Sequence, residues 1–145
     1  MTTFIRLVIV GGALGLATPG MAQAPCPGAA VELDHTALAA GILFGPLRLP
    51  RRVLANGVML APGCYVVRIT GHTSEQDRWV EFVSDGRVAG RELATVIPAA
   101  ELASVAGGQP PRSGDVRVQT LQGGDYVRVW VNAGGSHVLI HLPVA

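Results

Sequence analysis

Five side chains in the C-terminal third of the chain carry groups from which a ligand-binding site could be built. They are Arg117, Tyr126, Arg128, Trp130 and His137. An indole ring can stack on a planar or sugar ring, and guanidinium and imidazole groups can hydrogen-bond to the rim of that ring. The same side chains could instead form an outer sheet face on which arginine stems cover aromatic rings. The sequence supports both a ligand-binding and a structural interpretation.

Three segments with alternating side chains are expected to position these residues on neighbouring strands. Their ranges are 115–122, 125–131 and 136–142. A two-residue loop at Gly123-Gly124 sets Arg117 opposite Trp130. One face of this hairpin then carries valines, and the other face carries the polar and aromatic side chains.

The last two segments are expected to be joined by a four-residue loop at 132–135. This loop length places Val138 beside Val129 and puts His137 in the same row as Trp130. The predicted face then has an imidazole on one side of the indole and a guanidinium on the other.

Metal binding has weak support in the sequence. Four histidines occur, namely His35, His72, His137 and His141. The last two lie four residues apart on one expected strand, so their Cα atoms are about 13 Å apart and cannot share an ion. Outside the first 24 residues, no nucleotide-binding glycine loop occurs either. We therefore predict neither a metal site nor a cofactor.

A catalytic site would have to be assembled from distant segments, because no nucleophile-elbow motif occurs. Separate loops would have to bring three side chains into one cleft, namely His35, His72 and Asp77. Two carboxylates, Glu81 and Glu92, could approach across a hairpin at Asp85-Gly86 that pairs Glu81 with Gly90. Acidic pairs of this kind are mostly solvated strand faces, so we expect no enzymatic activity.

Residues 1–24 predict a cleaved secretory signal peptide. Arg6 precedes an apolar run from Leu7 to Ala17, and the small-residue site Ala22-Gln23-Ala24 follows. We expect cleavage after Ala24, because the apolar run of 11 residues is well short of the ~20 that a membrane-spanning helix needs. The mature protein is therefore expected to be exported, to the periplasm or outside the cell.

Two cysteines, Cys26 and Cys64, lie in the expected mature chain. An even number of cysteines in an exported domain usually means a disulfide, and this pair is the one intramolecular option. The bridge would attach the new N-terminus to a strand, and the loop-entropy treatment gives it roughly 4 kcal/mol. Lipidation of Cys26 is disfavoured because Pro25 replaces the small residue of a lipoprotein signal.

Composition limits the remaining function classes. The 121 residues that follow the expected cleavage site fit one domain with one core. No lysine occurs, and in the mature chain ten arginines face ten acidic residues, so the net charge is near zero. A chain without a basic field has no electrostatic means to hold nucleic acid, and we predict no nucleic-acid partner.

Short alternating segments separated by turn signals are typical of an all-β fold. Besides the three C-terminal segments, strands are expected at 51–55, 58–60, 64–70, 78–84 and 87–97, and residues 31–35 are a weaker candidate for a further short strand. Asn56-Gly57 and Asp85-Gly86 are two-residue hairpin turns. Residues 41–50 are expected to be a loop and residues 99–105 a helical turn. Seven or eight strands predict an antiparallel β-sandwich or a small barrel in a single domain over 25–145, after the signal peptide.

The segment Leu60-Ala61-Pro62-Gly63-Cys64-Tyr65-Val66-Val67 resembles a hairpin of small exported bacterial β-sandwich proteins. These proteins are of the transthyretin-like or carboxypeptidase-regulatory-like kind, with a Leu-Pro-Ala-Gly-x-Tyr pattern that is inverted here to Ala61-Pro62. The resemblance implies a structural corner with a tyrosine packed beneath it. It implies no activity and no functional residue.

We interpret the chain as an exported, non-catalytic binding or interaction module. One alternative is a small-molecule or glycan binder that uses the face around Trp130; an exposed indole would favour it, and an indole under a loop would disfavour it. Another alternative is a structural envelope protein whose edge strand, between Val53 and Leu60, pairs with a partner.

Overall fold

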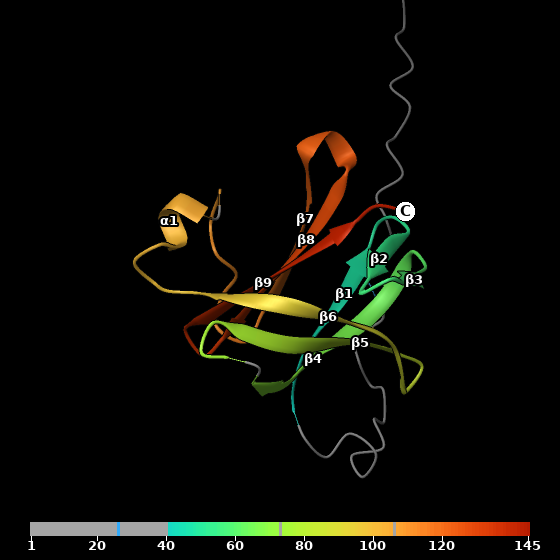
Figure 1. Cartoon of the computed structure of the whole chain (residues 1–145), viewed down its shortest axis with the longest axis horizontal. Coiled ribbons are helices and arrows are strands. Elements are labelled where there is room, and N and C mark those ends of the chain that lie inside the picture. The colour runs from blue at the N-terminus through green and yellow to red at the C-terminus, as the bar shows by residue number, and fades with distance from the viewer. Residues whose placement is uncertain (1–25, 27–40, 73, 106) are drawn as a thin grey trace, which may run out of the picture.

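The computed structural model describes Cys26 and residues 41–72, 74–105 and 107–145. The expected signal peptide and the expected strand at 31–35 lie outside the described residues. Seven strands form one antiparallel sheet, in the spatial order β1 (Ile42–Leu49), β4 (Gly63–His72), β5 (Asp77–Ser84), β6 (Arg87–Ile97), β9 (Ser136–Pro143), β8 (Tyr126–Ala133) and β7 (Val116–Leu121). Two short strands, β2 (Val53–Ala55) and β3 (Val58–Leu60), form a separate hairpin (Figure 1).

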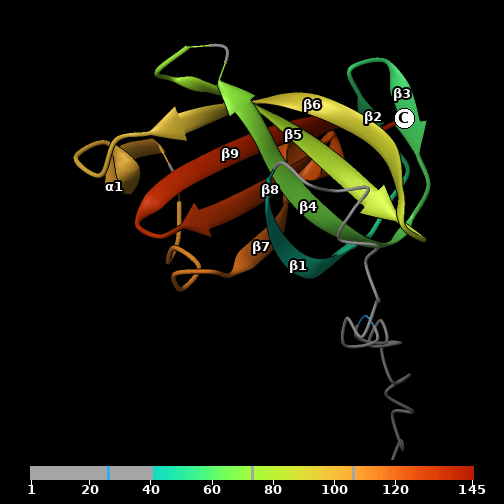
Figure 2. The same ribbon diagram turned by 90° about the horizontal axis from the view of Figure 1, so that it is seen from below.

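The large sheet curls until its two end strands, β1 and β7, lie next to each other (Figure 2). No ladder joins these two strands within the described part of the chain, so the barrel is nearly closed. The prediction of an all-β fold of the sandwich or small-barrel class is confirmed. Within the described ranges the helical content is small, with one helix at α1 (Leu102–Val105) and a single 3₁₀ turn at η1 (Gln122–Gly124). No helix in the described ranges is long and apolar enough to cross a membrane.

The interior of the barrel is filled by side chains. Every second residue of the strands points inward, and the most deeply buried ones are aliphatic or aromatic. They include Val67, Val80, Phe82, Val127, Val129, Ile140 and Leu142. The barrel is therefore a packed core and does not enclose a lumen.

The β2–β3 hairpin closes one end of the barrel. Its turn residues Asn56 and Gly57 have φ values of 46° and 78°, which confirms the predicted two-residue turn. Leu60 packs so closely on β6 that a Cβ at Gly90 would lie 3.0 Å from its Cδ2 atom. The Glu92 carboxylate accepts a hydrogen bond from the Asn56 main-chain N–H at 2.5 Å. The hairpin is thus attached to β6 by packing and by one charged hydrogen bond.

A disulfide joins Cys26 to Cys64 at the beginning of β4, with 5.6 Å between the Cα atoms. The predicted bridge is confirmed, and it is compatible with an exported protein because disulfides persist in oxidising compartments. Next to Cys64 in the sequence, the Tyr65 hydroxyl donates a hydrogen bond to the Ala61 carbonyl at 2.7 Å. The Ala61-Pro62-Gly63 corner therefore does have a buried tyrosine beneath it.

The expected loop at 41–50 is wrong, because β1 occupies Ile42–Leu49. The strand tolerates Gly45-Pro46 because its register with β4 shifts between Phe44 and Leu47. Such a bulge removes two residues from the ladder, so proline needs no hydrogen-bond donor there. Local turn signals were outweighed by the burial of Phe44, Leu47 and Leu49 against the core.

The expected pairing of Glu81 with Gly90 is also wrong. The Asp85-Gly86 turn pairs Ser84 with Arg87 as predicted, but a register shift between Phe82 and Val83 moves the rest of β5 by one residue. Glu81 then lies opposite Arg91. A shift of one residue exchanges the two faces of a strand, so Glu81 and Glu92 point to opposite sides and form no carboxylate pair.

Candidate functional site

The β7–β8 hairpin positions the first part of the predicted ligand-binding face. Arg117 lies opposite Trp130, and Gln119 lies opposite Arg128, as the glycine loop predicts. Tyr126 lies at the beginning of β8, opposite Leu121. The positive φ values of the two loop glycines, 67° and 107°, are the backbone conformations for which this loop needs glycine.

The expected four-residue loop at 132–135 is wrong. The loop has two residues, Gly134-Gly135, and β8 and β9 extend to either side of it. Val138 therefore lies opposite Val131, and His137 lies opposite Asn132, two residues away from the expected positions. A shift of two residues keeps every side chain on its predicted face.

Trp130 and His137 still meet, but they do so away from solvent. Trp130 is 0% exposed and His137 is 7% exposed. The Trp130 Nε1–H group donates a hydrogen bond to His137 Nδ1 at 3.0 Å, with the rings edge to face at a centroid distance of 5.8 Å. The His137 proton must then be on Nε2. Ile97, Leu139 and Leu102 complete a small second core around the indole.

Residues 98–105 and 107–112, which we call the cover segment, lie over this second core. Leu102 of α1 packs against it, and Pro111 is buried. The Asn132 amide donates to the Pro111 carbonyl at 2.9 Å, and Arg117 donates to the Gln109 carbonyl. Asn132 also accepts a hydrogen bond from Gly135 N. Asn132 was missed as a positioning residue because it was expected to lie in a loop.

The five predicted residues thus separate into two groups. Trp130 and His137 are buried, whereas Arg117 and Tyr126 are exposed and Arg128 is half-buried. An indole without exposed surface cannot stack on a ligand ring. The structure therefore lacks the exposed indole that a ring-stacking site at this face would need.

His141 shares the exposed part of this face with Arg128, to which it is paired across β8 and β9. Arg128 Nε donates to His141 Nε2 at 3.1 Å, which requires a neutral imidazole. Partial desolvation lowers the pKa of His141 from its usual 6.5, and the neighbouring Arg128 charge lowers it further. The unfolded chain therefore takes up this proton at a higher pH than the folded chain.

We accordingly expect His141→Gln to reduce the loss of stability in acid. A group with a lowered pKa in the folded state binds protons preferentially in the unfolded state, so stability falls as the pH drops below about 6.5. The measurement is the change in melting temperature between pH 7 and pH 5. The variant should lose fewer degrees than the wild type, and an identical loss would contradict the role assigned to His141.

At the end of the barrel opposite the β2–β3 hairpin lies a depression, which we call the mouth. It has a volume of about 320 Å³ and is mostly apolar. It is lined by Gly41, Ile42 and Phe44 at the beginning of β1, by residues 69–71 of β4, and by Arg78 and Ala133. Ile42 is 68% exposed, the largest value for any large hydrophobic side chain in the described ranges.

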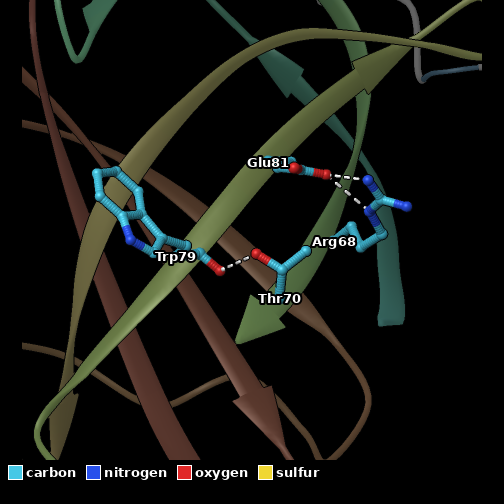
Figure 3. A network of polar contacts seen from close by, with 4 residues as sticks. All are labelled: Arg68, Thr70, Trp79 and Glu81. Carbon is cyan, nitrogen blue, oxygen red and sulfur yellow. Dashed lines mark hydrogen bonds and ion pairs between the residues drawn. The ribbon is translucent and has the colours of Figure 1, made fainter. Parts of the chain in front are cut away.

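Polar contacts join β4 to β5 beside the mouth (Figure 3). Arg68 donates to the Glu81 carboxylate through both Nε and Nη2, and Thr70 Oγ1 donates to the Trp79 carbonyl at 3.3 Å. A Cβ at Gly41 would lie 2.6 Å from the Arg68 Cγ atom, so glycine is needed where the chain enters β1. These hydrogen bonds therefore join the end of β4 to β5, and the beginning of β1 packs on the Arg68 stem.

Arg78 is the charged group of the mouth. Its Nη1 atom donates to the main-chain oxygens of Ser74, Glu75 and Asp77, at 2.6, 3.3 and 2.9 Å. In the described ranges, the one ion pair within 4.0 Å joins Arg68 to Glu81, so no carboxylate neutralises Arg78. The beginning of β5 thus presents a positive charge at the rim of an apolar depression.

Of the three side chains that a catalytic cleft would need, the structure describes one, that of Asp77. Asp77 accepts a hydrogen bond from the Ser74 hydroxyl at 3.0 Å and is engaged in this loop. His35 and the side chain of His72 lie outside the described residues. Within those residues, no group of three or more histidine, cysteine, aspartate or glutamate side chains is arranged to hold a metal ion.

Comparison with known proteins identifies no relative. No family model, no curated protein and no solved structure matches the chain. The resemblance of residues 60–67 to exported β-sandwich proteins stays a prediction.

Proposed function

We propose that the mature chain is a non-catalytic, exported binding module that holds a small aliphatic anion in the mouth of the barrel. The observation that carries this proposal is the apolar depression of about 320 Å³ with Arg78 at its rim. Apolar depressions with a few convergent polar groups are the usual sites for small ligands, and barrel mouths are among the usual places. The periplasm or the extracellular space is the proposed location.

The packed core limits the size of the ligand. Phe44 and the valines of the barrel fill the interior, and the β2–β3 hairpin closes the far end. A ligand must therefore lie in the mouth itself, where it covers Ile42 and Ile69. A short aliphatic chain gains free energy from this contact in proportion to the apolar area that it removes from water.

The charge of Arg78 selects the head group of the ligand. Its guanidinium is held by three main-chain oxygens through one nitrogen, which leaves other N–H groups able to bind a ligand. Carboxylates match the planar guanidinium and form charge-assisted hydrogen bonds with it. A medium-chain fatty acid anion satisfies both the apolar lining and the charge.

Two other surfaces have less support. The edge of β3 exposes Val58 and Met59, but the strand is only three residues long, and short edges restrict pairing with another chain. Its partner strand β2 is covered by a bridge between Val53 and Val144. The face around Trp130 lacks an exposed indole.

Calorimetric titration of the mature protein with octanoate and with 1-octanol tests the proposal. We expect saturable binding of octanoate, and we expect Arg78→Gln to weaken it about tenfold, which corresponds to about 1.4 kcal/mol, with little effect on octanol. Ile42→Asp should abolish binding of both compounds. The matched control is Val58→Asp, an exposed apolar residue at the closed end, which should leave binding intact. Absence of saturable octanoate binding, or equal losses in the two aspartate variants, would refute the mouth as the site.

A further inference from the structure

A second depression lies where the cover segment meets the beginning of β7. We call it the arginine pocket; it has a volume of about 370 Å³ and is lined by residues 109–112 and 115–117. Its lining is predominantly polar, in contrast to that of the mouth. It shares no lining residue with the mouth, so it is an independent candidate site.

The walls of the arginine pocket are fixed by main-chain and side-chain hydrogen bonds. Asp115 N donates to the Arg112 carbonyl at 2.9 Å, and Asn132 N donates to the Asp115 carbonyl at 3.1 Å. The Asn132 side-chain amide donates a hydrogen bond to the Pro111 carbonyl. Two consecutive prolines, Pro110 and Pro111, restrict the backbone further. A pocket with such walls is preorganised, which reduces the entropy lost when a ligand binds.

Three charged side chains line the pocket, and none of them is paired with another. Arg112 and Arg117 are positive and Asp115 is negative. Within the described part of the chain, these three form no ion pair within 4.0 Å. Arg117 donates from Nη1 to the Gln109 carbonyl, and a guanidinium has five N–H groups, so it can bind a ligand at the same time.

We propose that the arginine pocket binds a free α-amino acid with an acidic side chain. The ligand ammonium group would pair with Asp115, and its two carboxylates would pair with Arg112 and Arg117. Guanidinium groups bind carboxylates through paired hydrogen bonds, and Asp115 is the one carboxylate in the lining that can accept from an ammonium group. The lining carries a net charge of +1, which complements the net charge of −1 of such an amino acid.

Titration of ¹⁵N-labelled mature protein with L-glutamate tests this site by NMR. We expect saturable shifts of the amides at 109–117, with a Kd of about 1 mM or lower. Glutarate has the same two carboxylates without the ammonium group, and it should bind at least tenfold more weakly. Asp115→Asn should remove this preference, and Arg112→Gln should weaken binding of both compounds. The matched control Arg87→Gln changes an exposed arginine at the β5–β6 turn and should have no effect.

Other outcomes would overturn the proposal. Equal affinity for glutamate and glutarate would show that Asp115 does not bind the ammonium group of the ligand. An N-acetylated peptide that ends in glutamate lacks the free ammonium group; if it binds as tightly as free glutamate, the pocket recognises a peptide terminus and the proposal is wrong. Arg78→Gln should leave glutamate binding unchanged, so the proposed site in the mouth and the proposed site in the arginine pocket are tested independently.

Discussion

Replacing Trp130 by alanine is expected to lower the free energy of unfolding by about 3–5 kcal/mol, the range found for large aromatic side chains removed from a core. The indole has no exposed surface and contacts Ile97, Leu139 and Leu102. Its removal also takes away the N–H group that donates a hydrogen bond to His137 Nδ1, so this buried acceptor loses its partner. Chemical denaturation followed by circular dichroism measures the change.

The matched control is Trp79→Ala on the outer side of β5. Trp79 is half-buried, and its ring contacts the Arg91 guanidinium at 4.9 Å. We expect this variant to lose about 1–2 kcal/mol, because less apolar area returns to water and the cation–π contact at a partly exposed site is weak. If both variants lose the same amount, the cover segment does not bury Trp130 in solution. Iodide quenching of a Trp79→Phe variant, in which Trp130 alone reports, should then show an accessible indole.

Removing the disulfide is expected to have the second largest effect. The bridge closes a loop with a sequence separation of 38 residues, and loop-closure entropy assigns about 4 kcal/mol to a loop of that size. The double variant Cys26→Ser with Cys64→Ser should therefore lose about 4 kcal/mol of unfolding free energy. The barrel strands themselves should still form, because the main core does not include either cysteine.

Reduction of the wild-type protein provides the control for this variant. The reduced protein and the double variant should unfold at the same denaturant concentration, since both lack the covalent constraint on the unfolded chain. A loss below about 1 kcal/mol in both would show that the disulfide contributes little and that strand β4 is held by its ladders alone. A large loss in the variant but not on reduction would indicate damage by serine rather than loss of the bridge.

Turn chemistry and side-chain alternation allowed much of this fold to be predicted. Asn56-Gly57 and Asp85-Gly86 are dipeptides whose backbone preferences determine a hairpin without help from distant residues. The Gly123-Gly124 loop likewise determined the β7–β8 register, and with it the neighbours of Trp130. The cysteine pairing followed from the count alone. These features depend on interactions between residues close in the chain or on the absence of alternatives.

The tertiary structure decided the features that depend on distant contacts. The β1 strand forms in spite of Gly45-Pro46 because Phe44 and Leu47 are buried against a core that only the complete barrel provides. The register shift between Phe82 and Val83 leaves Ala89 of β6 without a partner and puts Glu81 and Glu92 on opposite faces, and no local pattern in the sequence predicts it. The burial of Trp130 arises because the cover segment returns across β8 and is fixed there by Asn132 and Arg117. The sequence by itself determined which side chains share a face along an unbroken strand, since strand alternation is local, whereas long-range packing decided where register shifts interrupt that alternation and which faces remain open to a ligand.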